Sequence, residues 1–227
     1  MDAAKTPAST PAAAEPGPAT LILSLGIAGL VSGVVIVGIY LATLSTIRQN
    51  RADALMRAVD EVLSLDAASS AKRILVVSGG RLVTYEPPAP GMLPDEPAVY
   101  AGYDGAGALV GLAVPAETAG FQDTVALIYG FDPRRDAIVG MKVLESRETP
   151  GLGDKIIKDA GFVGQFRDLP ADHELVGVKP GASAKRWEVD VISGATISSK
   201  AVLKAINLAN ERWRPLLAAF AREEAGS

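Results

Sequence analysis

The sequence predicts one N-terminal transmembrane helix followed by a mostly antiparallel α+β domain. Three observations support this fold class. Residues 21–47 carry no charged side chain, short β-prone runs separated by turn residues fill residues 73–145, and only a few segments have helical periodicity. Because the predicted strands follow one another without helices between them, neighbouring strands should pair in antiparallel fashion.

The composition excludes several classes of function. A net charge of −4, with no basic stripe, argues against nucleic-acid binding. The absence of cysteine excludes thiolate-bound iron–sulfur clusters, disulfides and cysteine nucleophiles. The single histidine, His173, excludes a histidine-rich metal site. We therefore predict no metal site, and any redox chemistry should depend on an organic cofactor or a partner.

The N-terminal region predicts a tail and a membrane anchor. Residues 1–20 consist mostly of Ala, Pro, Thr and Ser and are expected to be a disordered cytoplasmic tail, since they contain too few large apolar side chains to offset the entropy of ordering. As a helix, residues 21–47 would extend about 40 Å, which exceeds the ~30 Å hydrocarbon core of a bilayer. A cleaved signal peptide fits less well, because the apolar run is long and the preceding segment is not basic.

The charges that flank the span give one indication of its orientation. Arg48, Arg51 and Arg57 follow the span, whereas Lys5 is the one basic residue that precedes it. By the positive-inside rule, this distribution favours a cytoplasmic C-terminal domain. The rule is weakest for a long domain that follows a single span, so the charge count alone leaves the side open.

Beyond the span, periodicity predicts a helix at residues 51–65, a second helix at 154–166 and a final helix from about 198 to 213, ended or kinked by Pro215. Residues 123–145 should form a hairpin. The predicted strands are 73–77, 81–85, 98–103, 108–116, 123–131, 137–145, 175–178 and 187–192.

The first loop with a distinctive pattern is Glu148-Thr149-Pro150-Gly151-Leu152-Gly153. A residue before proline is extended, and Pro-Gly suits the two central positions of a type II turn. The turn should present Leu152, with the polar groups of Glu148 and Thr149 nearby and Gly153 as a second permissive position. A plain surface turn is the alternative, although an apolar side chain between two glycines generally packs against something.

The second loop is Asp190-Val191-Ile192-Ser193-Gly194-Ala195-Thr196-Ile197-Ser198-Ser199. It joins a predicted strand to the final helix, and Ser198 and Ser199 are candidate N-caps. Gly194 and Ala195 leave the backbone uncovered, so a phosphate could reach the N–H groups at the positive end of the helix. A capped helix start without a ligand is the alternative. Neither a P-loop nor a G-x-G-x-x-G fingerprint is present in the sequence.

Together with the N-terminal span, the two loops resemble the FMN-binding subunits of two related complexes. These are the G subunit of the Rnf-type ion-translocating oxidoreductase and the C subunit of the sodium-translocating NADH:quinone oxidoreductase. The run from Asp190 to Thr196 is similar to the flavinylation signature Asp-x-x-Ser/Thr-Gly-Ala-Thr. In that family the last threonine carries FMN through a phosphoester bond, which implies that Thr196 is the acceptor. The resemblance implies that residues 98–222 are the FMN-binding domain and residues 48–97 a linker helix with peripheral strands.

The resemblance also implies a set of cofactor-binding residues and a maturation partner. A threonine hydroxyl does not attack a pyrophosphate unaided, so a flavin transferase that splits FAD is expected. Asp190 is a candidate for transferase recognition or metal contact, with a solvent-facing strand residue as the alternative. Lys200 is a candidate for pairing with the phosphate. The isoalloxazine ring is expected to rest on the glycine-rich turn against Leu152. The expected cofactor-binding residues are Thr196, Ser193, Gly194, Ala195, Asp190, Ser198, Ser199, Lys200, Glu148, Thr149, Gly151, Leu152 and Gly153.

The function implied by the resemblance is electron transfer on covalent FMN, within a membrane complex that couples electron flow between ferredoxin and NAD to ion translocation. The chain would carry electrons for the other membrane subunits without turning over a substrate itself. The family places the flavin domain on the periplasmic side of the bacterial inner membrane, and we adopt that side against the arginine count. The alternatives are a stand-alone anchored flavin carrier and a non-redox, flavin-responsive anchored module.

Overall fold

The computed structural model describes residues 17–66, 68–89 and 91–226. The chain divides into two compact units between Ile47 and Arg48. The helices are α1 (Pro18–Leu63), α2 (Lys155–Lys158), α3 (Ala160–Gly164) and α4 (Thr196–Ala225). The strands are β1 (Ala71–Ser78), β2 (Arg81–Tyr85), β3 (Ala98–Tyr103), β4 (Leu109–Ala119), β5 (Thr124–Asp132), β6 (Ala137–Glu145), β7 (Leu169–Pro170), β8 (Val176–Val178) and β9 (Glu188–Asp190).

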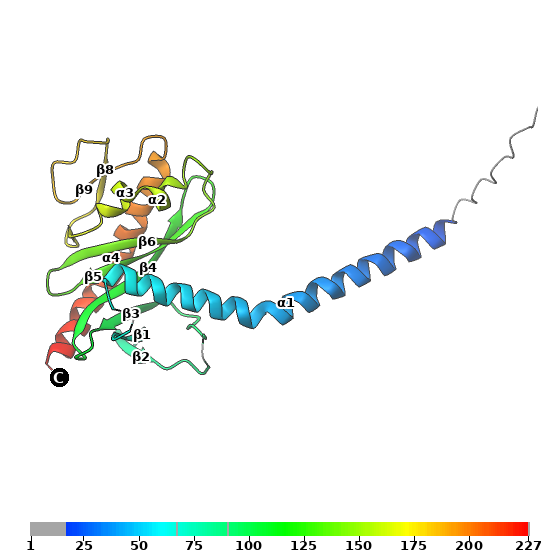
Figure 1. Ribbon diagram of the computed structural model, residues 1–227, viewed down its shortest axis with the longest axis horizontal. Helices are drawn as coiled ribbons and strands as arrows, with labels where there is room; N and C mark the ends of the chain where they lie inside the picture. The colour runs from blue at the N-terminus through cyan, green and yellow to red at the C-terminus, as the bar shows by residue number, and fades with distance from the viewer. Residues whose placement is uncertain (1–16, 67, 90, 227) are drawn as a thin grey trace, which may run out of the picture. The chain divides into compact units, whose positions relative to one another are not determined.

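Helix α1 is continuous over 46 residues (Figure 1). Its first part, up to Ile47, belongs to the N-terminal unit. Its large apolar side chains from Leu21 to Leu41 are exposed. Among the described residues, α1 is the one helix long and apolar enough to cross a membrane. The predicted helix at 51–65 is the second half of the same helix. Of the predicted tail, residues 1–16 lie outside the described residues, and its last part is helical from Pro18, since proline suits a first helical turn.

Within the described residues, seven strands form an antiparallel sheet in the order β2-β1-β3-β4-β5-β6-β7. The predicted α+β class and the predicted hairpin, formed by β5 and β6, are confirmed. Two details differ from prediction. Strand β7 is too short to give a sequence pattern, and β8 and β9 pair in parallel as a separate two-stranded sheet.

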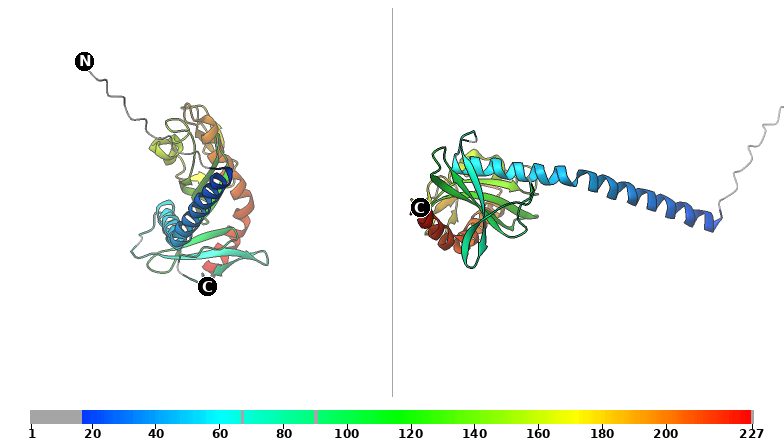
Figure 2. Two further views of the ribbon diagram at one scale, coloured as in Figure 1. Left: turned by 90° about the vertical axis from the view of Figure 1, so that its right-hand side faces the viewer. Right: turned by 90° about the horizontal axis from the view of Figure 1, so that it is seen from below.

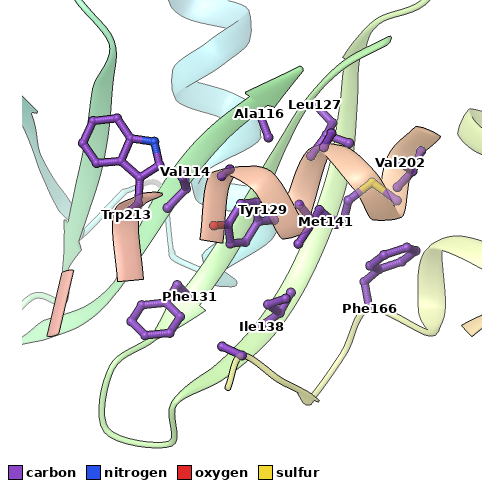
Figure 3. Close-up of a cluster of buried hydrophobic side chains, with 14 of the residues drawn as sticks. Val114, Ala116, Leu127, Tyr129, Phe131, Ile138, Met141, Phe166, Val202 and Trp213 are labelled. Atoms are coloured by element: carbon purple, nitrogen blue, oxygen red, sulfur yellow. The ribbon is translucent and has the colours of Figure 1, made fainter. Parts of the chain in front are cut away.

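Helix α4 covers one face of the large sheet and supplies the main core. Val114, Tyr129 and Met141 of the sheet pack with Val202 and Trp213 of α4 (Figure 3). These side chains are all buried. Because side chains alternate along a strand, the residues between them point to the other face.

The C-terminal part of α1 packs on that other face, so the sheet lies between α1 and α4 (Figure 2). Val59 and Val62 contact Tyr100 and Ile128 there. A Cβ at Gly130 would lie 2.5 Å from the backbone oxygen of Val62, so the strand and the helix approach too closely for a side chain. Strands β1 and β2 belong to the same sheet, while the functional boundary at residue 98 stays a prediction.

The predicted helix at 154–166 is wrong as a single element, because Asp159 interrupts it. Asp159 is extended (φ −80°, ψ 99°), and its side chain accepts a hydrogen bond from the Phe162 backbone N–H at 3.0 Å. It therefore ends α2 and caps α3. The competing local hydrogen bond of an Asp side chain explains why helical periodicity alone missed the break.

The predicted bounds of the last helix, 198–213, are also wrong. Helix α4 begins at Thr196 and continues through Pro215 to Ala225. Proline removes one backbone donor, but Leu217 and Phe220 are buried beyond it and belong to the same core as Trp213. Tertiary packing outweighs the cost of the lost hydrogen bond.

Candidate functional site

The loop after β6 forms the predicted turn. The Leu152 N–H donates to the Thr149 carbonyl oxygen at 3.1 Å, and Gly151 has a φ of +79°, as the third residue of a type II turn requires. The Gly151 N–H donates to the Asp154 Oδ1 atom at 2.7 Å, which braces the turn from the side. Leu152 is 52% exposed at the tip. The loop thus presents an apolar side chain to the outside of the protein.

The second loop makes a similar turn directly before α4. The Ala195 N–H donates to the Ile192 carbonyl oxygen at 3.0 Å, and Gly194 has a φ of +79°. Helix α4 then begins at Thr196, whose side chain is exposed, while Ser193 is exposed within the turn. The turn therefore leads directly into the first residue of the helix.

The predicted N-cap roles of Ser198 and Ser199 are wrong. Ala195 occupies the N-cap position, and no side chain caps the helix among the described residues. Both serines lie inside the first turn and are buried. The Ser199 hydroxyl oxygen accepts from the Ile192 N–H at 3.1 Å. It therefore stabilises the turn that precedes α4 and does not cap the helix. The first intrahelical hydrogen bond is the one that the Ser199 N–H donates to the Ala195 carbonyl oxygen at 2.8 Å. The N–H groups of residues 196–198 precede it and have no intrahelical acceptors, which leaves the positive end of α4 open.

The two loops contact each other, although about fifty residues separate them. The Ser198 hydroxyl donates to the Glu148 Oε2 atom at 2.5 Å. A Cβ at Gly153 would lie 2.5 Å from that same carboxylate oxygen and 2.8 Å from Ser198 Oγ, so glycine is required by the close approach. A Cβ at Gly194 would lie 3.9 Å from Leu152 Cδ2, which shows that the two turns lie side by side.

The centre of this contact is the Glu148 carboxyl group, which belongs to a residue that is 6% exposed. Besides Ser198, it accepts hydrogen bonds from the backbone N–H groups of Phe121 at 2.8 Å and Gln122 at 3.1 Å. Burial alone would raise the pKa of Glu148. The hydrogen bonds from Ser198, Gln122, Phe121 and Asp123 outweigh burial and hold the pKa below its ordinary value. Glu148 is therefore a buried carboxylate that stays ionised at neutral pH.

Sequence reasoning missed the third loop at this site, the β4–β5 connection at residues 120–123. The Thr149 hydroxyl donates to Gln122 Oε1 at 3.1 Å, and a Cβ at Gly120 would lie 2.3 Å from Glu148 Oε1. Phe121 is 66% exposed. An aromatic residue beside a glycine between two strands was the available signal. Each of the three loops exposes one large apolar side chain: Phe121, Leu152 and Ile197.

Asp190 and Lys200 make other contacts. The Asp190 carboxylate accepts from the Ser183 N–H at 3.0 Å. Burial would raise its pKa, but hydrogen bonds from the Gly181, Ser183 and Ala182 segment lower it. Lys200 is exposed one turn after Thr196. The Cγ atom of its side chain passes close to Gly177 of β8, where an added Cβ would lie 3.4 Å from it. Within the described residues, no group of three or more His, Asp or Glu side chains could hold a metal ion.

Part of the chain matches a known family. Residues 120–211 match the family model of the FMN-binding domain. The resemblance to FMN-binding subunits, predicted from the two motifs, is thereby confirmed. The match covers all three loops that meet at Glu148.

Two relatives carry the name of the G subunit predicted from the motifs. The chain is 42% identical over 111 residues to the G subunit of the ion-translocating oxidoreductase complex of Methanosarcina acetivorans, covering 48% of this chain and 55% of the relative. It is 36% identical over 103 residues to the G subunit of the proton-translocating ferredoxin:NAD(+) oxidoreductase complex of Clostridium ljungdahlii, covering 45% and 53%. The chain thus spans about half the length of the curated relatives it matches.

Two solved structures share the fold. The C subunit of the Na(+)-translocating NADH-quinone reductase from Parabacteroides distasonis superposes with a TM-score of 0.58 at 18% identity, covering 76% of this chain and 94% of that one. NqrC of Shewanella oneidensis gives a TM-score of 0.56 at 19% identity, covering 78% and 99%. At these identities the likeness shows the fold alone.

Proposed function

We propose that this protein is a membrane-anchored flavoprotein that carries electrons on covalently bound FMN. It acts as a subunit of a complex that couples electron transfer between ferredoxin and NAD to ion translocation. The observation that carries the proposal is the Asp190–Thr196 signature, which ends at the open N-terminus of α4 beside the Leu152 turn. The names of the relatives support membership of such a complex.

The described residues fit FMN at both of its ends. The phosphodiester that joins FMN to Thr196 would lie at the uncapped N-terminus of a 30-residue helix, where backbone N–H groups and the helix dipole favour its single negative charge. The turn at Ser193, Gly194 and Ala195 has no bulky side chain to cover those donors. Exposed Leu152 offers an apolar surface of the kind that an isoalloxazine ring packs against.

Each residue of the site has a task in this proposal. Thr196 supplies the ester oxygen, and the first-turn N–H groups of α4 neutralise the phosphate. Gly151 and Gly153 shape the turn that carries Leu152, while Thr149 ties this turn to Gln122. Bound FMN supplies the one- and two-electron chemistry. The protein holds the ring beside an apolar surface and leaves it accessible to partner redox centres.

Attachment requires a flavin transferase. The Thr196 hydroxyl oxygen would form a bond to the FMN phosphorus of FAD, the pyrophosphate P–O bond would break, AMP would leave, and the hydroxyl proton would pass to a base of the transferase. Thr196 is exposed at the start of α4 and so is accessible to a second enzyme. In this proposal the carboxylate of Asp190, five residues before Ala195, contributes to recognition by the transferase.

The proposed location is the bacterial inner membrane, with α1 as a single span and the flavin domain on the periplasmic side. The apolar, exposed side chains of α1 support anchoring. The side follows from the resemblance to the FMN-binding subunits. The arginines after the span oppose that side, in the situation where the positive-inside rule is weakest.

Co-expression with a flavin transferase tests the proposal. The wild-type chain should show flavin fluorescence in a denaturing gel and the mass of one attached FMN, and Thr196→Ala should lose both. Thr84→Ala, which removes an exposed threonine hydroxyl on β2 outside the three loops, is the matched control and should keep them. Covalent FMN on Thr196→Ala contradicts the assignment. No flavin on the wild-type chain would instead favour the non-redox anchored module, and flavin without co-purifying membrane subunits the stand-alone carrier.

A further inference from the structure

The Glu148 carboxylate occupies a site that the surrounding backbone is shaped to hold. Gly120 on one side and Gly153 on the other leave room for its two oxygens, since a Cβ at either position would lie 2.3 Å from Oε1 or 2.5 Å from Oε2. The donors to these oxygens come from the loops at 120–123 and at the start of α4. One buried side chain therefore joins three loops that are distant in sequence.

Among the described residues, no cation forms an ion pair with the Glu148 carboxylate. The salt bridges among the described residues include Glu145 with Arg51 and with Arg147, but none includes Glu148. Its partners are N–H and O–H dipoles, which stabilise the ion without cancelling its charge at a distance. In a site shielded from water, such a charge acts on its neighbours more strongly than an exposed one does.

The position of this charge matters because of what lies on either side of it. Ser198, which donates to Glu148 at 2.5 Å, is two residues from Thr196. Glu148 itself directly precedes the turn at residues 149–152, which presents Leu152. A flavin esterified to Thr196 and resting against Leu152 would therefore lie over the segment that Glu148 holds together.

We propose that Glu148 is a positioning residue of the flavin site, which bridges to Ser198 to align the acceptor turn with the Leu152 turn and places a fixed negative charge beside the flavin. This inference rests on the proposed function. The bridge keeps Thr196 and the ring surface in register for attachment. The charge disfavours the electron-rich reduced flavin, so it lowers the reduction potential of the bound cofactor.

Two variants of the full-length, flavinylated protein in detergent separate the charge from the bridge. Glu148→Gln keeps the shape of the side chain and removes the charge, whereas Ser198→Ala keeps the charge and removes the bridge. Glu145→Gln is the matched control, since it removes an exposed carboxylate three residues away on β6. Spectroelectrochemical titration gives the flavin midpoint potential, and intact mass gives the fraction of chains that carry FMN.

The expected result is a higher midpoint potential in Glu148→Gln and an unchanged one in Glu145→Gln. We expect the relative stability of reduced flavin to change at least tenfold, which is about 30 mV for a two-electron couple. Ser198→Ala should lower the attached fraction while the potential stays closer to wild type. A merely structural role for Glu148 would lower attachment or stability without this charge-specific shift.

Equal potentials in wild type and Glu148→Gln would overturn the inference. If Glu148→Gln does not fold or takes up no flavin, Ser198→Ala decides, because normal attachment in that variant overturns the bridge and reduced attachment supports it. These outcomes differ from failure of the proposed function, in which the wild-type chain itself carries no FMN after co-expression with the transferase.

Discussion

The turns at residues 149–152 and 192–195 have similar backbone geometry but different surroundings. Each closes with a hydrogen bond from its fourth residue to its first and has a glycine with a φ of +79° at the third position. The first follows the buried Glu148, is braced by Asp154 and ends in an exposed leucine. The second opens into the uncapped N-terminus of α4. Similar turns therefore present different groups: the first presents the Leu152 side chain, and the second presents a helix end at Thr196, the proposed acceptor.

The first experiment disrupts the contact between the two turns. Gly153→Ala would place a Cβ within 2.8 Å of Glu148 and Ser198 and force the loops apart. We expect a loss of about 1–3 kcal/mol in the free energy of unfolding, measured by denaturant titration of the purified full-length chain. Gly164→Ala, where a Cβ meets nothing within 4 Å, is the control and should be close to neutral. Equal stability of the two variants would contradict the close packing.

The second effect concerns the pH dependence that Glu148 imposes on this contact. Its folded-state pKa is lowered, so its contribution is fully present above the ordinary glutamate pKa of 4.5 and is lost as the pH falls through the lowered value. At pH 7, Glu148→Gln should cost about 1.5–3 kcal/mol, the range for hydrogen bonds to a charged group. Unfolding titrations from pH 7 to pH 3 should show the difference between variant and wild type shrinking below about pH 4.5. A difference independent of pH would argue against an ionised Glu148.

A third experiment compares the two turns directly. Gly151→Ala and Gly194→Ala each place an L side chain at a φ of +79° where no clash within 3.4 Å occurs. Both should cost about 1–2 kcal/mol from backbone strain alone, as measured by thermal unfolding in detergent. The attached FMN fraction should fall more in Gly194→Ala, because this turn positions Thr196. An equal fall in attachment would show that the turns do not have separate roles.

The smallest effect is expected at the brace of the first turn. The Asp154 carboxylate accepts from the Gly151 N–H and from Lys158, and these hydrogen bonds lower its pKa, with the Lys158 bond as the largest cause. The group is solvent-accessible, so Asp154→Asn should lower the melting temperature only slightly. The difference should diminish further in high salt, which screens the ion pair. A large decrease in melting temperature that does not depend on salt would show that the Asp154 hydrogen bonds stabilise the turn more than the geometry indicates.

The sequence predicted the parts of the fold that depend on local pattern. The six strands from β1 to β6, the apolar helix and the turn at Pro150-Gly151 follow from alternation, hydrophobicity and the backbone limits of proline and glycine. The end of α4 did not follow from local pattern, because burial of Leu217 and Phe220 carries the helix through Pro215. The break at Asp159 was missed because a side-chain cap competes with helical periodicity.

The site was predictable in its motifs but not in its assembly. Glu148 and Ser198 were both candidate binding residues, yet no sequence spacing shows that a carboxylate and a hydroxyl fifty residues apart share a hydrogen bond. The loop at Phe121 was missed for the same reason, since its link to Glu148 is made by backbone N–H groups, which every residue except proline has. Residue type predicts Ser198 and Ser199 as N-caps, but both side chains are buried and bond to Glu148 and to the Ile192 N–H instead.

The central claim is that FMN is esterified to Thr196, and locating the adduct tests it most directly. Trypsin should release residues 187–200 as one peptide, bounded by Arg186 and Lys200, which contains Thr196 together with Ser193, Ser198 and Ser199. Tandem mass spectrometry of the flavinylated full-length chain should place the whole added mass on Thr196. An adduct on one of the three serines, or an unmodified peptide from a chain that fluoresces in a denaturing gel, would contradict the account.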